Sequence, residues 1–339
     1  MHAAIIVIGV FVFSLFRAEP GASITLQPGD LVFTHNFGSG AGAVSVLDPD
    51  TGLTTMISSD SLLDSPRHLV VDEAGLIFVA NTSGTIIRID PSTGDHSVLT
   101  TFPQLASEGG LAIAPSGSLY VTARPDGVPS SLVQVDPVSG NQTIIVTDVL
   151  LSGTKALSLD EEGRFVFAKS GVSEGSLLLF DPSTQMITTL LTSVLSGGTL
   201  ETSLGPGVAV QSDGDIVLSE NGYPALSVLE KDAAVQDRVL GPSHICDDEP
   251  TLCGGYYGIA VSENGDIAAI IETRTGLEGV WILDGSLNGD KAFLPLPGGS
   301  NPRGLAFVPI PEPSTACLLA LGLVGIAARR TRSGRRPKA

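Results

Sequence analysis

Five basic side chains are the residues of this chain best suited to chemistry, because each stands beside a predicted β-strand of an otherwise acidic protein. They are Arg67, Arg124, Lys155, Lys169 and Arg303. Residues 24–310 contain 11 Lys and Arg against 34 Asp and Glu. Guanidinium and ammonium groups bind carboxylates and phosphates. Together with the adjacent His68, these cations predict a site for the uronic-acid or phosphate groups of an extracellular polymer.

A structural interpretation of the same cations competes with this one. In it they form salt bridges inside the protein with Glu108, Glu220 and Glu272. The overall charge excludes one class of ligand under either interpretation. The formal net charge is −18, whereas nucleic-acid binding needs a basic surface. We therefore expect no nucleic-acid partner.

Other motifs with chemical potential are weak. Residues 284–290 have the alternating oxygen ligands that open a calcium loop, but Pro295 stands where the closing Glu belongs, so we interpret them as a hairpin turn. The sequence has no Gly-rich phosphate loop, His-Glu-x-x-His or Cys-x-x-Cys, and no nucleophile elbow with Gly-x-Ser-x-Gly between a predicted strand and a predicted helix. Hydrolase and redox chemistry therefore have no support from motifs. We predict a binding module without a cofactor rather than an enzyme.

The cysteines are consistent with an exported protein. Cys246 and Cys253 flank six residues, and a disulfide would close this short loop in an oxidising compartment. Two Cys without further Cys nearby are poor zinc ligands. We therefore predict a Cys246–Cys253 disulfide, while Cys317 lies in a terminal apolar segment.

A repeated motif positions these residues. Its five copies share a turn glycine, at Gly75, Gly117, Gly163, Gly214 and Gly265. The spacing of 42 to 51 residues is that of propeller blades. Each copy contains short apolar strands joined by Gly-containing turns, and four third strands end in Asp-Pro, at residues 48, 90, 136 and 181.

The first and last segments of this repeat complement each other. The chain enters the motif at its second strand, residues 31–34, whereas residues 304–308 resemble a first strand with no blade after it. Pairing the two would close a ring and remove exposed sheet edges. We therefore predict an all-β, six-bladed β-propeller over residues 24–310, and a monomer. The five cations then surround one mouth of its central channel, because they precede first strands or follow second strands.

Residues 111–121 and 259–269 resemble the blade pattern of the NHL-repeat and SMP-30/gluconolactonase-like propellers. That resemblance implies an alternative function, a metal-dependent hydrolase with one Ca or Mg ion held by oxygen ligands. The candidate ligands are Asn36, Asn81, Glu220, Asn221 and Glu272. The sequence departs from the family at Arg67, Lys155 and Arg303, which would repel a metal ion. A further resemblance, to virginiamycin-B-lyase-like propellers, implies a magnesium-dependent lyase that uses His68 and Glu108.

The N-terminus resembles a secretory signal. Residues 3–16 are apolar and uncharged, too short to span ~30 Å of hydrocarbon comfortably, and the small residues 21–23 follow. We interpret residues 1–23 as a signal peptide, although no Lys or Arg precedes the apolar run and Arg17 follows it. A permanent N-terminal anchor is the alternative.

The C-terminus has three features in order: Pro311-Glu312-Pro313, an apolar run over residues 314–328, and six basic residues in the last eleven. By the positive-inside rule, we expect the basic tail itself to stay on the cytoplasmic side of the membrane. This arrangement resembles the PEP-CTERM sorting signal over residues 311–339. The resemblance implies processing by an exosortase, transient membrane insertion of the C-terminal segment, and an exported body at the cell surface or in the extracellular matrix.

Overall fold

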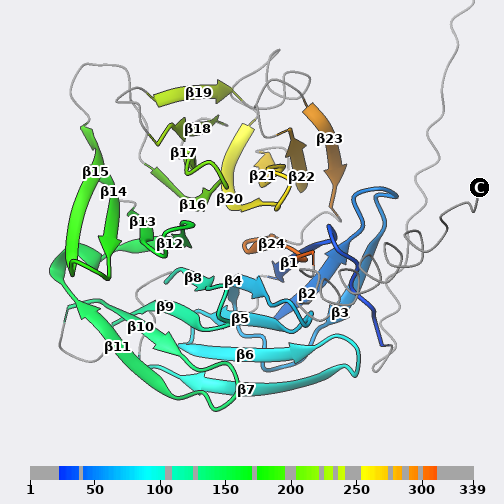
Figure 1. The fold of residues 1–339 in the computed structure, drawn as a ribbon. Helices are drawn as coiled ribbons and strands as arrows, with labels where there is room; N and C mark the ends of the chain where they lie inside the picture. The colour runs from blue at the N-terminus through cyan, green and yellow to red at the C-terminus, as the bar shows by residue number, and fades with distance from the viewer. Residues whose placement is uncertain are drawn as a thin grey trace, which may run out of the picture.

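In the computed structural model, the described residues form a ring of six four-stranded antiparallel sheets (Figure 1). They are residues 23–37, 41–103, 109–124, 129–169, 174–194, 204–220, 225–231, 236–240, 253–273, 278–284, 290–296 and 301–310. The prediction of an all-β, six-bladed propeller is thereby confirmed. In this part of the chain the only helix is a 3-10 turn at Val149–Leu151, and no helix is long and apolar enough to cross a membrane. The helices predicted for the signal and sorting segments lie outside the described residues.

Each blade runs from an innermost to an outermost strand. Blade 1 contains β24 (Leu305–Phe307), β1 (Leu31–Asn36), β2 (Gly42–Leu47) and β3 (Thr54–Ser58); blade 2 contains β4 (Pro66–Val71), β5 (Ile77–Asn81), β6 (Thr85–Asp90) and β7 (Asp95–Thr101); blade 3 contains β8 (Leu111–Ile113), β9 (Leu119–Ala123), β10 (Ser131–Val135) and β11 (Gln142–Thr147). Blade 4 contains β12 (Thr154–Leu159), β13 (Phe165–Lys169), β14 (Glu174–Asp181) and β15 (Met186–Val194); blade 5 contains β16 (Leu204–Val210), β17 (Ile216–Glu220), β18 (Ala225–Leu229) and β19 (Gln236–Leu240); blade 6 contains β20 (Cys253–Val261), β21 (Ile267–Thr273), β22 (Glu278–Leu283) and β23 (Asp290–Pro295).

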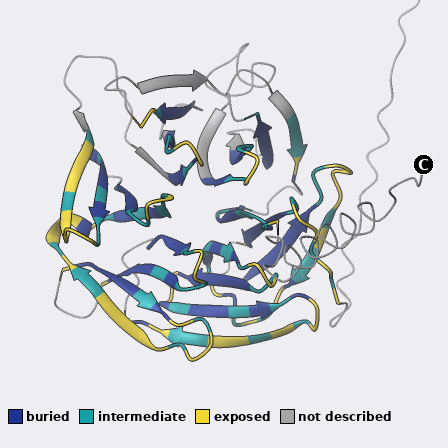
Figure 2. Ribbon diagram, in the orientation of Figure 1, coloured by how far each residue is buried: buried dark blue, intermediate teal, exposed yellow. Residues whose placement is uncertain are grey.

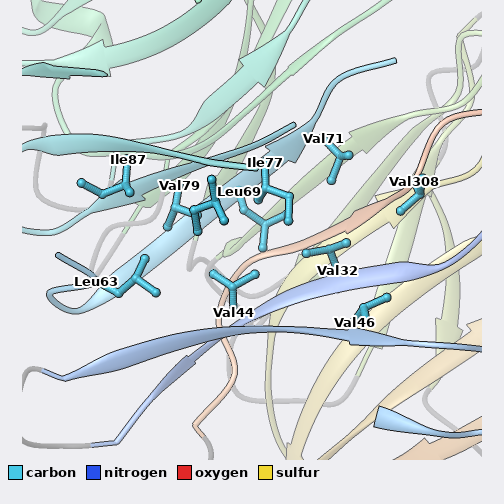
Figure 3. Close-up of a cluster of buried hydrophobic side chains, with 11 residues drawn as sticks. Val32, Val44, Val46, Leu63, Leu69, Val71, Ile77, Val79, Ile87 and Val308 are labelled. Atoms are coloured by element: carbon cyan, nitrogen blue, oxygen red, sulfur yellow. The ribbon is translucent and has the colours of Figure 1, made fainter. Parts of the chain in front are cut away.

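Apolar side chains on both faces of each sheet hold the ring together. Successive residues of a strand point to opposite faces, so every blade packs on two neighbours. Leu69 and Val71 pack with Val32 of blade 1, whereas Val70 packs with Leu111 of blade 3. Six clusters of buried apolar residues result, one at each contact between neighbouring blades; Figure 3 shows the cluster between blades 1 and 2. This packing explains why the inner strands are continuous apolar runs.

Burial is greatest in the middle strands of the blades, lower in the innermost strands and lowest in the outermost ones (Figure 2). Every residue of β5 is buried, whereas β7 and β11 at the outer edges of their blades have no buried residue. The outer strands accordingly contain Thr, Ser and Gln, which tolerate water. The hydrophobic contribution to stability therefore comes from the two inner strands and the third strand of each blade.

The Asp-Pro turns after the third strands are closed by their own carboxylates. Asp48 Oδ1 accepts hydrogen bonds from the backbone N–H of Asp50 at 2.9 Å and of Thr51 at 3.2 Å. Equivalent bonds form at Asp90, Asp136 and Asp181. Hydrogen bonds from the Ser or Thr that follows hold the pKa of all four carboxyls below its usual value. The turns thus form most completely when these groups are ionised.

The fourth residue after each of these Asp residues adopts a left-handed conformation. It is glycine in three turns, including Gly52 with φ of 71°, and its N–H donates back to the Asp carbonyl. Blade 4 has Gln185 there instead, with φ of 59° and the same backbone bond to Asp181 at 2.8 Å. A side chain is disfavoured in this conformation, so Gln185 is a strained position in an otherwise regular repeat.

The ring closes between the two ends of the body. β24 pairs with β1 in the register Leu31–Phe307 and Phe33–Leu305, which confirms the predicted closure. The missing turn of blade 1 is rebuilt across this junction: Gly29 N–H donates to the carbonyl of Val308 at 3.1 Å, and Val308 N–H donates to the carbonyl of Asp30 at 2.8 Å. The same two bonds close the turn at Gly75 within one continuous segment.

His35, on β1, belongs to the core of blade 1 with a side chain only 2% exposed. Its Nε2 lies 2.7 Å from Ser45 Oγ, and its ring centroid lies 4.5 Å from that of Phe33 and 5.8 Å from that of Phe37. Nδ1 has no hydrogen-bond partner among the described residues. Burial lowers the pKa of His35 to about 4, so the imidazole is neutral near pH 7.

The strained turn gives a first prediction. Gln185→Gly should raise the free energy of unfolding by about 0.5 kcal/mol, because relief of the left-handed strain exceeds the added entropy of the unfolded chain. Gly52→Ala is the matched control. An added Cβ would meet only Leu294 Cδ2, at the ordinary contact distance of 3.7 Å, so its cost is the strain of the left-handed conformation. This substitution should lower the free energy of unfolding by about 1 kcal/mol. Urea denaturation measures both. A change of the opposite sign in either variant would contradict the strain argument.

Burial of His35 gives a second prediction, on pH. The ordinary imidazole pKa is 6.5, so between pH 6.5 and 4 the unfolded chain binds a proton that the folded chain does not. The free energy of unfolding should therefore fall by about 3 kcal/mol as the pH is lowered through this window. His35→Gln keeps a donor for Ser45 and cannot titrate, so its stability should change much less. Denaturation curves at several pH values give the free energy of unfolding as a function of pH. An equal dependence on pH in both proteins would refute this assignment.

Candidate functional site

The six innermost strands surround the axis of the ring (Figure 1). Their side chains line a central channel of about 260 Å³. Each strand contributes three residues to the wall, and Ser158 is the one polar residue among them. In each sheet the innermost strand pairs along one edge only, so its other edge directs backbone N–H and C=O groups toward the axis. Typical small-molecule pockets measure roughly 300–1,000 Å³. The channel therefore has room for a single small group, while a polymer can reach only its mouth.

The channel has two distinct ends. We call the end where the innermost strands begin the rim; it also carries the loops from second to third strands and the connections between blades. The opposite end, the turn face, carries the turns that join first to second and third to fourth strands. The pairs Pro66–Asn81 and Thr154–Lys169 place the end of a second strand beside the start of a first strand. The predicted site residues that the structure describes therefore share the rim.

In four inner strands a glycine directly precedes the residues that line the channel, and it lets the blades converge. These glycines are Gly110, Gly207, Gly258 and Gly304. A Cβ on Gly304 would lie 2.7 Å from the carbonyl oxygen of Arg67, and one on Gly258 would lie 2.7 Å from that of Arg303. Such distances leave no room for a side chain. The backbones that carry Arg303 and Arg67 are therefore adjacent.

The five cations form an arc along the rim over four consecutive blades, with Arg303 on blade 1, Arg67 on blade 2, Arg124 on blade 3, and Lys155 and Lys169 on blade 4. We call these five residues the cationic arc. Arg124 is exposed and the other four are half-buried, as is His68. Blades 5 and 6 have no Lys or Arg among the rim side chains that the structure describes.

Two members of the cationic arc are held by their surroundings. Arg67 Nε donates to Thr82 Oγ1 at 3.3 Å, and the Thr82 hydroxyl donates to the carbonyl of Ser65 at 2.8 Å. Burial lowers the pKa of Lys169, which Asp148 partly offsets. A bound anion beside the Lys169 ammonium would favour its charged form and so oppose this lowering of the pKa.

The two ends of the propeller differ strongly in charge. At the rim, the described acidic side chains are Asp60, Asp64, Asp148 and Glu278, against the five cations of the arc. At the turn face, the described acidic side chains number 18: Asp30, Asp48, Asp50, Asp72, Glu73, Asp90, Asp95, Asp136, Asp160, Glu161, Glu162, Asp181, Asp213, Asp215, Glu230, Glu263, Asp266 and Asp284. Among the described basic side chains, only Arg164 and Lys231 lie at the turn face, and both pair with Glu162. The described acidic side chains are thus concentrated at the turn face.

Of the alternative metal ligands, only the side chains of Asn36 and Asn81 lie within the described residues. Asn81 is buried and uses its Nδ2 to donate to the carbonyl of Leu62 at 2.6 Å and to Thr85 Oγ1 at 2.9 Å, so it holds the rim loop in place. Asn36 ends β1 on the neighbouring blade. No group of three or more His, Cys, Asp or Glu positioned for a metal ion occurs in the described part of the chain.

Several predicted groups fall outside the described residues. They are Glu108, Asn221, Cys246, Pro311, Glu312, Pro313, residues 285–289, and the side chains of Glu220, Cys253 and Glu272. The disulfide, the internal salt bridges of the cations and the metal cluster therefore stay predictions. His35, a rim residue for which the sequence assigned no role, is a core residue. The only signal for this in the sequence is the apolar run Leu31–Phe33 that precedes it.

Comparison with known proteins supports the fold and the sorting signal. Residues 309–333 match the family model of the PEP-CTERM protein-sorting motif. A search of curated protein sequences found no match. Among solved structures, TolB from Acinetobacter baumannii is similar over 83% of this chain and 67% of its own, with 18% identity and a TM-score of 0.63.

Two further structures have a similar fold. One belongs to a nidogen/laminin complex, with 9% identity, a TM-score of 0.63, and coverage of 83% of this chain and 99% of that one. The other is virginiamycin B lyase from Staphylococcus aureus, with 14% identity, a TM-score of 0.54, and coverage of 85% and 92%. At these identities the likeness extends to the propeller fold alone and does not confirm the NHL or SMP-30 resemblance. The PEP-CTERM motif indicates export, anchoring in the membrane before processing, and processing by an exosortase. The chain is thus an exported propeller protein with a PEP-CTERM sorting motif.

Proposed function

We propose that this exported propeller is a binding module of the cell surface or extracellular matrix whose cationic arc binds an anionic polymer. The observation that carries the proposal is the charge difference between the two ends. Nearly half of the Lys and Arg of the body lie along one rim, although the body as a whole is strongly acidic. A basic patch on an acidic protein attracts anions, while the acidic remainder of the surface repels them.

The dimensions of the channel favour binding across the rim. A chain that bears carboxylates or phosphates can lie along the arc from blade 1 to blade 4, and one of its groups can point into the channel mouth. Arg67 and Arg303 offer planar forks for bidentate contact, while Lys155 and Lys169 offer point charges. A polymer that contacts several cations at once gains affinity from each of them.

The hydrolase and lyase alternatives lack a comparable observation. Both require a metal ion, and the described residues contain no group of three or more His, Cys, Asp or Glu positioned for one. Cations beside a metal would raise the cost of binding it. We therefore infer binding without catalysis, and without a requirement for calcium or magnesium.

Polymer binding is tested with residues 24–310 and fluorescent polygalacturonate, a polymer of uronic acid. Arg67→Ala/Lys155→Ala should weaken binding at least about tenfold, because the two lost charge-assisted contacts together contribute more than about 1.4 kcal/mol. Arg164→Ala/Lys231→Ala, which removes two cations from the turn face, is the matched control and should leave binding unchanged. Added salt should weaken binding of the unaltered protein, and neutral dextran should not bind.

Three results would contradict the proposal. One is equal affinity of the unaltered protein and Arg67→Ala/Lys155→Ala. Another is an equal loss in both double variants, which would indicate non-specific attraction. The third is abolition of binding by EDTA with recovery on adding calcium or magnesium, which would favour the metal-dependent alternative.

A further inference from the structure

Both ends of the propeller body leave from the turn face. β24 runs from the rim toward the turn face, where the N–H of Ile310 donates to Glu263 Oε1 at 3.1 Å. Glu263 lies in the turn between the first two strands of blade 6. At the other end, the N–H of Ile24 donates to the carbonyl of Pro91 at 2.8 Å. Pro91 lies in the turn between the third and fourth strands of blade 2. Either end, if it is attached to a membrane, therefore holds the body by the same face.

The connection to the sorting segment is short. Only residues 311–313 separate Ile310 from Ser314, where the apolar run begins. Four residue steps span at most about 14 Å when fully extended. A compact domain of this length has a radius of gyration of about 19 Å. The tether is therefore shorter than the body, which cannot rotate freely about it.

The turn face also carries most of the acidic side chains that the structure describes. With 18 described acidic side chains against two basic ones, it is strongly hydrated and is repelled by anionic lipid. The tether keeps this face close to the membrane, while its charge opposes insertion into the headgroups. The rim, with the cationic arc, lies at the far ends of the same strands.

We propose that, in the membrane-anchored precursor, the turn face lies next to the membrane and the rim points away from it. The orientation follows from the strand topology, the position of Ile310 and the sorting motif, and it holds whatever the rim binds. It leaves the mouth of the channel open to the surroundings of the cell. The membrane thus contacts one end of the propeller and solutes contact the other.

Energy transfer from the body to labelled lipid headgroups tests this orientation. The full chain is reconstituted into phosphatidylcholine vesicles with a headgroup acceptor, and p-azidophenylalanine at one position carries the donor. Ser116 on the turn face and Ser83 on the rim are matched positions, because both are exposed and each takes part in only one weak hydrogen bond of 3.4 Å. Transfer should be several-fold more efficient from position 116 than from position 83.

A longer tether is the control. Twenty Gly and Ser residues inserted between Ile310 and Pro311 have a mean span of about 25 Å, which should release the body and bring the two efficiencies together. Arg67→Ala/Lys155→Ala should leave the ratio as in the natural chain, so failure of polymer binding and failure of the orientation are distinguishable. Equal or reversed efficiencies in the natural chain, or a ratio that the long tether does not change, would overturn the proposal.

Discussion

The pairing of β24 with β1 is the interaction on which the whole ring depends. Without it, blade 1 would lack its innermost strand, and the apolar faces of blades 1, 2 and 6 would lose part of their cover. Phe307 and Leu305 pack toward blade 6, whereas Ala306 and Val308 pack toward blade 2. A segment of only a few residues near the C-terminal end of the body therefore completes two interfaces at once. The channel exists only when that segment is in place.

Much of this architecture is predictable from the sequence because it rests on local rules that the chain repeats. The regular spacing of Gly75, Gly117 and their equivalents predicts the turns between first and second strands. The Asp-Pro pairs predict where the third strands end. The missing first strand of blade 1 is visible as a surplus strand at residues 304–308. Gly29 is harder to recognise, because its turn is built from two segments far apart in the sequence and no continuous motif describes it.

The candidate site is predictable in position and not in detail. The repeat predicts which residues reach the rim, since that depends only on where each strand begins and ends. It does not show that Arg67 is held by Thr82, nor that the amide of Asn81 donates to the carbonyl of Leu62. Those properties depend on contacts between residues of different blades or loops. The burial of His35 has the same origin, because Phe33, Phe37 and Ser45 enclose it only after the sheet has formed.

The split turn at Gly29 has a mechanical consequence. A pull on the sorting segment reaches the body at Ile310 and runs along β24, in the direction of the strand. The backbone bonds that join residues 305–307 to residues 31–33 then carry the force together, in shear, and are not unzipped one after another. The contact of Ile310 with Glu263 lies outside them and would be the first to break. The junction that closes the ring is therefore also placed to resist detachment of the body from its anchor.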